Sequence, residues 1–196
     1  MPRKNARNTK GRIIAAAWKL FYDQGYEETT VEDILFESGT SRGSFYHYFQ
    51  SKDALLGTLS DVFDEQYARL MPTLTPDMDA VARLRYLNRE LFMVIEERIS
   101  RELLGRLLST QLFAAGEKCL LDQNRLYFKL LRKICSEGRA AGQLRRDMTT
   151  NEIIKAYAMW ERALLYDWCL CGGDYSLAAY TERMTPVFLE SFRASC

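Results

Sequence analysis

The chain has 196 residues, of which 47% are hydrophobic and 27% are charged, and its formal net charge is +1. This composition is globular rather than disordered, and the length allows one large domain or a small domain followed by a larger one. Because it has no run of about 18 apolar residues, and no apolar segment directly behind its basic N-terminus, we expect a cytoplasmic protein without membrane association.

The first segment is basic and is predicted to be helical. From Thr9 to Gln24 apolar residues recur every three or four positions, and Gly25 supplies a left-handed C-cap. A cationic arm at this place neutralises DNA phosphates, although a solvated tail has the same composition. The basic residues that precede the first acidic residue are Arg3, Lys4, Arg7, Lys10, Arg12 and Lys19.

Two short helices separated by a tight break are predicted next. Thr30 is placed as the N-cap of the first helix, with Asp33 three residues later as in a capping box, and this helix ends near Ser38. Ser41 caps the second helix, which runs to about Phe49. This layout is typical of a helix-turn-helix, here over about residues 30–49, whose second helix enters the major groove of DNA.

The second of these helices has two different faces. Phe45 and Phe49 are placed to anchor it, while Arg42, Ser44 and His47 fall on the exposed side. An apolar stripe alone is more often part of a core than of a recognition surface. The exposed polar face and the basic arm together therefore support the DNA-binding interpretation.

The remainder of the chain is predicted to be helical as well. Ser51 opens a long fourth helix, and the segment from Pro72 to Asp79 forms a break before the larger region. Pro186 is expected to kink or divide the last helix. Sustained alternation of apolar and polar residues is absent, so we expect an all-α chain. The later helices are expected at about residues 77–97, 101–115, 117–141, 150–171 and 176–194.

The helix-turn-helix region carries a family signature. GYEETTVEDI at residues 25–34 and GTSRGSFYHYFQSK at residues 39–52 resemble the N-terminal signature of the tetracycline-repressor (TetR) family. EGRAAGQL at residues 137–144 extends a looser likeness to the C-terminal part. Leu35-Phe36 replaces a small and a polar residue of the family pattern, and Thr40 replaces valine. The first departure predicts altered packing of the second helix or an exposed Phe36.

The resemblance implies a two-domain organisation. Residues 1–52 would form a three-helix DNA-binding domain, and residues 53–196 a larger helical domain for effector binding and dimerisation. The family implies a homodimer that binds a pseudo-palindromic double-stranded DNA operator and a small-molecule effector, without a cofactor. The implied function is a transcriptional repressor that the effector releases from its operator; a transcriptional activator or a ligand-independent DNA-binding protein is the alternative.

The resemblance also assigns individual residues to DNA. Arg42 would contact a base edge or a phosphate, and Gly43 would let the recognition helix approach the groove closely. His47 would contact the DNA backbone, although a lone histidine is often a structural hydrogen-bonding residue. The implied DNA contacts are Thr30, Ser41, Arg42, Gly43, Ser44, Tyr46, His47 and Lys52.

The residue types argue against most enzyme classes. His47 is the only histidine, and the five cysteines form no CxxC pair, so histidine-based catalytic triads, metal sites and a disulfide framework are not expected. We expect no catalytic residue; a helical enzyme or a partner-binding scaffold is the alternative from another class. Cys169 and Cys171 would form a redox sensor only if the pKa of their thiols were lowered.

Two further sites are expected in the C-terminal region. Tyr157, Trp160 and Glu161 lie about one turn apart and are the candidate effector-binding residues, although aromatic residues at this spacing are more often core. By resemblance, the last two helices form the dimer surface. Its expected members are Leu164, Leu165, Trp168, Leu177, Tyr180, Met184, Phe188 and Phe192.

Overall fold

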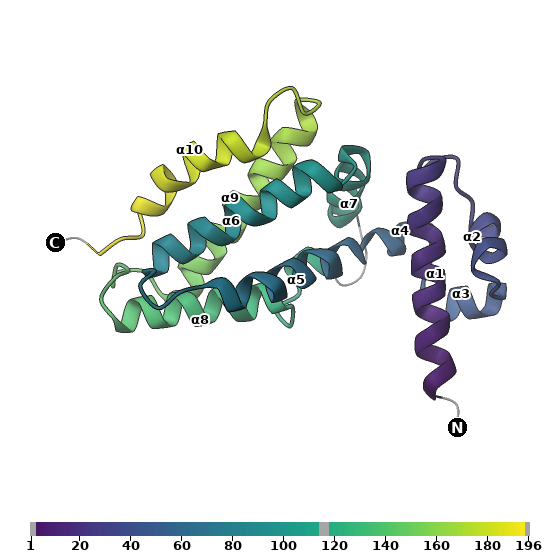
Figure 1. The fold of residues 1–196 in the computed structure, drawn as a ribbon, viewed down its shortest axis with the longest axis horizontal. Helices are drawn as coiled ribbons and strands as arrows, with labels where there is room; N and C mark the ends of the chain where they lie inside the picture. The colour runs from purple at the N-terminus through teal and green to yellow at the C-terminus, as the bar shows by residue number, and fades with distance from the viewer. Residues whose placement is uncertain (1–2, 114–117, 195–196) are drawn as a thin grey trace. The chain divides into compact units, whose positions relative to one another are not determined.

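The computed structural model describes residues 3–113 and 118–194, with side chains from Thr9 onward within these ranges (Figure 1). Every element assigned there is a helix, apart from an isolated antiparallel bridge between Leu144 and Arg193, so the all-α prediction is confirmed. None of the described helices is long and apolar enough to cross a membrane. The chain divides into two compact units, Met1–Ser60 and Asp61–Cys196.

The first unit packs short helices around one long helix. Helix α1 (Arg3–Asp23) contacts α2 (Val31–Ser38) and α3 (Arg42–Tyr48), and a short helix α4 (Lys52–Leu56) follows. The apolar positions that predict these helices are the ones that turn inward. The buried apolar side chains include Ile13, Ala17, Phe21, Tyr26, Ile34, Phe45, Phe49, Leu55 and Leu56.

The predicted fourth helix is shorter in the structure. Ser51 caps it as expected, but α4 ends at Leu56 and a separate helix α5 spans Leu59–Leu70. At the break, Thr58 Oγ1 donates a hydrogen bond to the Leu55 carbonyl oxygen at 2.6 Å. Gly57 follows the last residue of α4, and glycine is unfavourable inside a helix. Apolar spacing alone does not reveal this break.

The second unit is a bundle of longer helices. The break at the prolines is confirmed, since a short 3-10 helix η1 (Met71–Thr73) is followed by non-helical chain up to Asp79. The start of the helix predicted at 117–141 is wrong. A 3-10 turn η2 (Cys119–Leu121) comes first, and the α-helix begins only at Leu126. The α-helices that follow η1 are α6 (Ala80–Arg98), α7 (Arg101–Phe113), α8 (Leu126–Ala140), α9 (Thr150–Leu170) and α10 (Leu177–Glu190).

Helices α6 and α9 make most of the contacts within this bundle. Helix α6 packs on α8 and α10, and α9 packs on α7, α8 and α10 (Figure 1). Gly138 permits the close approach of α8 to α6, because a Cβ there would lie 2.4 Å from the Ala80 Cβ. Helix α10 continues through Pro186 without being divided.

Candidate functional site

The predicted capping box fixes the N-terminus of α2. Thr30 Oγ1 accepts from the Asp33 backbone N–H at 3.1 Å, and the Asp33 carboxylate accepts from the Thr30 N–H at 2.9 Å. Hydrogen bonds from the side chain and the backbone of Thr30 lower the pKa of Asp33. Thr30 is exposed, as contact with a DNA phosphate requires.

Gly39 and Arg12 hold the turn between α2 and α3. Gly39 adopts a left-handed conformation with φ 58°. The Arg12 guanidinium donates to the carbonyl oxygen of Gly39 at 2.8 Å and also to that of Ser38. A cation is favoured at these carbonyls because they lie at the C-terminal end of α2. Arg12, a member of the basic arm, therefore has a structural role in the turn.

Helix α3 has the two faces that its sequence predicts. Ser41 caps the helix by accepting from the Ser44 backbone N–H at 3.2 Å. Phe45 and Phe49 are 0% and 5% exposed, and they fix the inner face. The outer face is formed by Arg42, Gly43, Tyr46 and His47, which are exposed, with Ser44 half-buried. The polar side chains of α3 therefore lie on the side opposite its buried phenylalanines.

Arg42 of α3 is paired with a residue of α2. Its guanidinium forms an ion pair with the Glu32 carboxylate, and the two side chains are 65% and 61% exposed. Exposed pairs of this kind contribute roughly 0–1 kcal/mol. The ion pair with Glu32 therefore holds the Arg42 guanidinium only weakly.

Lys52 is engaged by the chain itself. Its Nζ donates to the carbonyl oxygens of Tyr26 at 2.7 Å, Thr29 at 2.8 Å and Glu27 at 3.4 Å. It also lies 4.2 Å from the centroid of the Tyr26 ring. The ammonium thus ties the start of α4 to the turn that leads into α2. A phosphate bound by Lys52 would have to displace one of these carbonyls.

Other residues of the basic arm also contact the first unit. Lys10 Nζ lies 5.9 Å from the Phe49 ring centroid, and Lys19 Nζ lies 2.6 Å from Glu37 Oε1. The hydrogen bond and the charge of Glu37 raise the pKa of Lys19. The side chains of Arg3, Lys4 and Arg7 fall outside the described residues.

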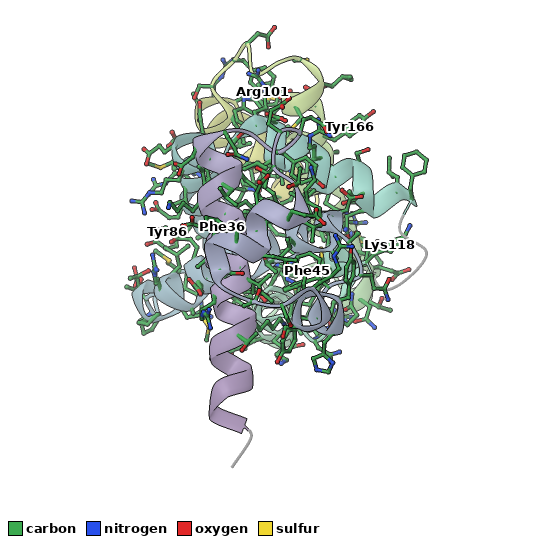
Figure 2. All side chains as sticks on the ribbon, turned by 90° about the vertical axis from the view of Figure 1, so that its right-hand side faces the viewer. Phe36, Phe45, Tyr86, Arg101, Lys118 and Tyr166 are labelled. Atoms are coloured by element: carbon green, nitrogen blue, oxygen red, sulfur yellow. The ribbon has the colours of Figure 1, made fainter. Side chains whose placement is uncertain are left out.

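The departures from the family pattern have visible consequences. Phe36 is 89% exposed, so of the two expected outcomes its exposure is observed (Figure 2). Leu35 is half-buried. Thr40 Oγ1 lies 2.7 Å from Ser38 Oγ, a hydrogen bond that a valine does not form. Thr40 therefore adds a bond inside the turn.

A buried carboxyl group lies at the centre of a hydrogen-bond cluster in the second unit. Glu161 accepts from the Tyr127 hydroxyl at 2.5 Å and from Asn88 Nδ2 at 3.0 Å. Asn88 Oδ1 in turn accepts from Thr185 Oγ1 at 3.0 Å. Burial raises the pKa of Glu161, against the hydrogen bonds of Tyr127 and Asn88, which lower it. The sequence does not reveal these partners because they lie on α6, α8 and α10.

A mainly apolar cavity of about 50 Å³ adjoins this cluster. Glu161 lines it, whereas Tyr157 and Trp160 are not among its lining residues. The Tyr157 hydroxyl instead donates to the Leu84 carbonyl oxygen at 3.0 Å. Trp160 stacks on Phe188 with ring centroids 4.6 Å apart. Of the three candidate effector-binding residues, the structure therefore brings only Glu161 to the cavity wall.

Most residues expected at the dimer surface are buried inside the single chain. Leu164, Leu165, Trp168, Leu177 and Phe192 are each 8% exposed or less, so this part of the expectation is wrong. Both faces of α9 are apolar, and spacing alone does not say which one turns inward. The large apolar residues that α9 and α10 expose are Met159, Tyr166, Leu170, Tyr180 and Val187.

The described cysteines do not have the properties of a redox sensor. Cys119, Cys135, Cys169 and Cys171 are free thiols, and Cys196 lies outside the described residues. Burial raises the pKa of the half-buried Cys169. Cys171 is exposed, and slight desolvation together with the charges of Asp167 and Asp174 raises its pKa. A sensor requires the opposite shift.

A capped helix-turn-helix with an exposed polar recognition face, followed by a larger helical unit, defines a DNA-binding transcriptional regulator. Residues 13–59 match the model of bacterial regulatory proteins of the tetR family. The chain belongs to the TetR family. The expected regulator class, as opposed to an enzyme, is therefore confirmed.

The relatives agree with this assignment along most of the chain. An uncharacterised HTH-type regulator of Lactococcus lactis is 50% identical over 48 residues, which are 24% of each protein. The regulator TtgR of Pseudomonas putida is 24% identical, covering 98% of this chain and 95% of its own length. The structure of the TetR-family repressor FadR from Thermus thermophilus with lauroyl-CoA has a TM-score of 0.73 at 24% identity, covering 92% of both chains.

Proposed function

We propose that this regulator is a homodimeric repressor that binds a pseudo-palindromic operator in the cytoplasm and is released by a small-molecule effector. The outer face of α3 carries the DNA half of this proposal. Its exposed Arg42, Tyr46 and His47 stand on a helix whose other side is fixed by buried Phe45 and Phe49. A recognition helix that is held in this way loses little entropy when it binds.

The remaining DNA contacts follow from the helix ends. Thr30 and Ser41 cap α2 and α3, where backbone N–H groups favour phosphate. Ser44 adds a hydroxyl beside Ser41, and their Oγ atoms lie 2.9 Å apart. The sequence places the domain boundary after Lys52; since the first compact unit extends to Ser60, we assign α4 to the DNA-binding part.

Dimerisation is assigned to the exposed faces of α9 and α10. Met159, Tyr166 and Leu170 form an apolar stripe on α9, and Tyr180 and Val187 form one on α10. Pairing these faces about a twofold axis buries apolar area on both protomers and supports an isologous dimer. The two recognition helices would then read half-sites roughly 34 Å apart.

The effector half of the proposal is supported by the second unit. It contains the cavity beside Glu161, and the FadR structure with a similar fold holds lauroyl-CoA. An effector that favours a different separation of the two recognition helices lowers operator affinity by its differential affinity for the two arrangements.

The test is selection of DNA from a random library by the purified chain, followed by titration of the selected sequence. Arg42→Ala should abolish specific binding while leaving the dimer intact. Arg69→Ala is the matched control, because Arg69 is 68% exposed and faces Glu65 across 4.0 Å. Unchanged binding by the Arg42 variant would show that the recognition surface lies elsewhere.

A reporter assay separates repression from activation. The selected operator is placed over a promoter and transcription is measured with and without the regulator. Lower transcription with the regulator is expected, and higher transcription would indicate an activator. If no small molecule that binds the regulator changes transcription from the reporter, the protein is a ligand-independent DNA-binding protein.

A further inference from the structure

A groove of about 350 Å³ lies on the second unit, between the end of α7, the turn η2 and α9. This volume is within the usual range for small-molecule sites. Its wall is mainly apolar and includes the exposed side chains of Leu112 and Tyr166. Lys118 also lines it, and both Lys118 and Tyr166 can be followed in Figure 2.

The groove adjoins the cavity beside Glu161. Leu108, Leu120 and Arg162 line both spaces, so they form the partition between them. The cavity alone, at about 50 Å³, holds a few water molecules rather than an effector. An effector would therefore lie in the groove and end at this partition.

The charges on these walls are not equally satisfied. Arg125 Nη2 lies 2.7 Å from Asp64 Oδ1, and the Glu161 carboxyl accepts from Tyr127 and Asn88. Arg162 is half-buried and makes no hydrogen bond or salt bridge within residues 9–113 and 118–194, although its charge acts to lower the pKa of Glu161, against the larger effect of burial. An anion that binds a half-buried guanidinium forms charge-assisted hydrogen bonds, which are stronger than neutral ones and offset the loss of water around the charge.

From this arrangement we propose that the effector is an amphiphile with an anionic head group. The head binds Arg162 at the partition, and the apolar body lies along the apolar wall of the groove. Lys118 is a second cation on the groove wall, and the groove lining contains no acidic residue among the described positions. This inference rests on the proposed function, since it names the class of its effector.

The alternative of a cationic effector has less support. Glu161 is the acid of the cavity wall, but its carboxyl already accepts two hydrogen bonds. Its burial favours the neutral form. A cation entering through the groove would also pass Arg162 and Lys118, which repel it.

The location of the groove connects this ligand to the dimer. Tyr166 lines the groove and belongs to the exposed apolar stripe of α9. An amphiphile seated against it would change the surface assigned to dimerisation. The two recognition helices would thereby be set at a different separation.

The experiment is calorimetric titration of the purified full-length chain with four ten-carbon probes below their micelle concentrations. Decanoate and decanoyl-CoA carry an anionic head, decyltrimethylammonium a cationic head, and 1-decanol no charge. Arg162→Met is compared with Arg162→Lys, which keeps the charge, and with Arg69→Met on α5 as the matched control. Circular dichroism verifies that each variant is folded.

We expect at least one anionic probe to bind and decyltrimethylammonium not to bind. Arg162→Met should weaken the anionic probe about tenfold or more, because a hydrogen bond to a charged group is lost; Arg162→Lys should recover part of it. Binding of decanoate assigns a free acid, and binding of decanoyl-CoA alone assigns a thioester.

The inference fails if neither anionic probe binds, if the cationic or uncharged probe binds as tightly, or if Arg162→Met binds the anion unchanged. DNA selection without any ligand is measured in parallel. Specific DNA binding together with one of these results refutes the effector class alone. Absence of specific DNA binding refutes the proposed function.

Discussion

The Lys52 ammonium nitrogen lies 2.7 Å from the Tyr26 carbonyl oxygen, and the neighbouring Asp53 carboxylate accepts from the Tyr26 hydroxyl. The start of α4 thus holds one buried tyrosine by its backbone and by its side chain. Tyr26 also packs on Phe21 of α1, with ring centroids 5.0 Å apart. Tyr26 thus connects three parts of the first unit: α1, α4 and the turn before α2. Because α3 packs on α1, these contacts also stabilise the position of α3.

Lys52→Met is therefore expected to act on stability. The loss of charged hydrogen bonds to carbonyls should lower the free energy of unfolding by roughly 1–3 kcal/mol. Chemical denaturation at fixed protein concentration measures this, with Lys52→Arg as the variant that keeps the charge. DNA binding is titrated at several salt concentrations. Loss of a phosphate contact would reduce the slope of log affinity against log salt concentration by about 0.9. That result, with unchanged stability, would show that Lys52 contacts DNA.

Glu32→Gln should tighten DNA binding. The glutamate competes with DNA for Arg42 and places a negative charge beside the phosphates. Because such exposed pairs contribute roughly 0–1 kcal/mol, a gain of about two- to fivefold in affinity is expected. Fluorescence anisotropy with the selected operator measures it, and Glu65→Gln beside Arg69 is the control. Weaker binding would mean that Glu32 positions Arg42 for the groove.

The buried Glu161 predicts a pH dependence of stability. Burial raises its pKa from the ordinary 4.5, so the folded chain keeps the proton at pH values where the unfolded chain has lost it. The contribution to stability is then largest at acidic pH and falls as the pH rises from about 4.5 toward the raised pKa. Glu161→Gln removes the ionisable group and with it this pH-dependent contribution to stability. Denaturation across this window should show the wild type losing stability relative to the variant, and exposed Glu65→Gln is the control.

The parts of the fold that the sequence predicts well are those set by neighbouring residues. The Thr30–Asp33 box and the Ser41 cap join residues three positions apart, so their hydrogen bonds can be predicted from the sequence. The first residues of α2 and α3 follow from these caps. The inward side of Phe45 and Phe49 follows from helical spacing.

The parts that it does not predict depend on contacts between distant segments. Arg12 and Lys52 have the composition of phosphate ligands, yet their guanidinium and ammonium groups bind backbone carbonyls of other elements. Glu161 finds Asn88 and Tyr127 on two other helices. The charge of a residue is known from the sequence, but its interaction partner depends on the tertiary structure.

Gly43→Ala is expected to affect stability and DNA binding in opposite directions. A Cβ at Gly43 would meet no heavy atom within 4 Å, so the free protein does not require glycine there. Alanine in this helix should raise the free energy of unfolding by up to about 1 kcal/mol. If α3 approaches the groove as closely as the family resemblance implies, the methyl group meets the DNA. Affinity should then fall, by about fivefold or more if the methyl group costs a typical 1–3 kcal/mol of overpacking.

Thermal unfolding and anisotropy on the same sample measure the two effects of Gly43→Ala. Gly105→Ala on α7 is the control, because its Cβ would make only an ordinary contact, 3.9 Å from the Cys169 Cβ. The control should gain stability without losing DNA affinity. Full DNA affinity in Gly43→Ala would show that the backbone of α3 does not approach the DNA at this position.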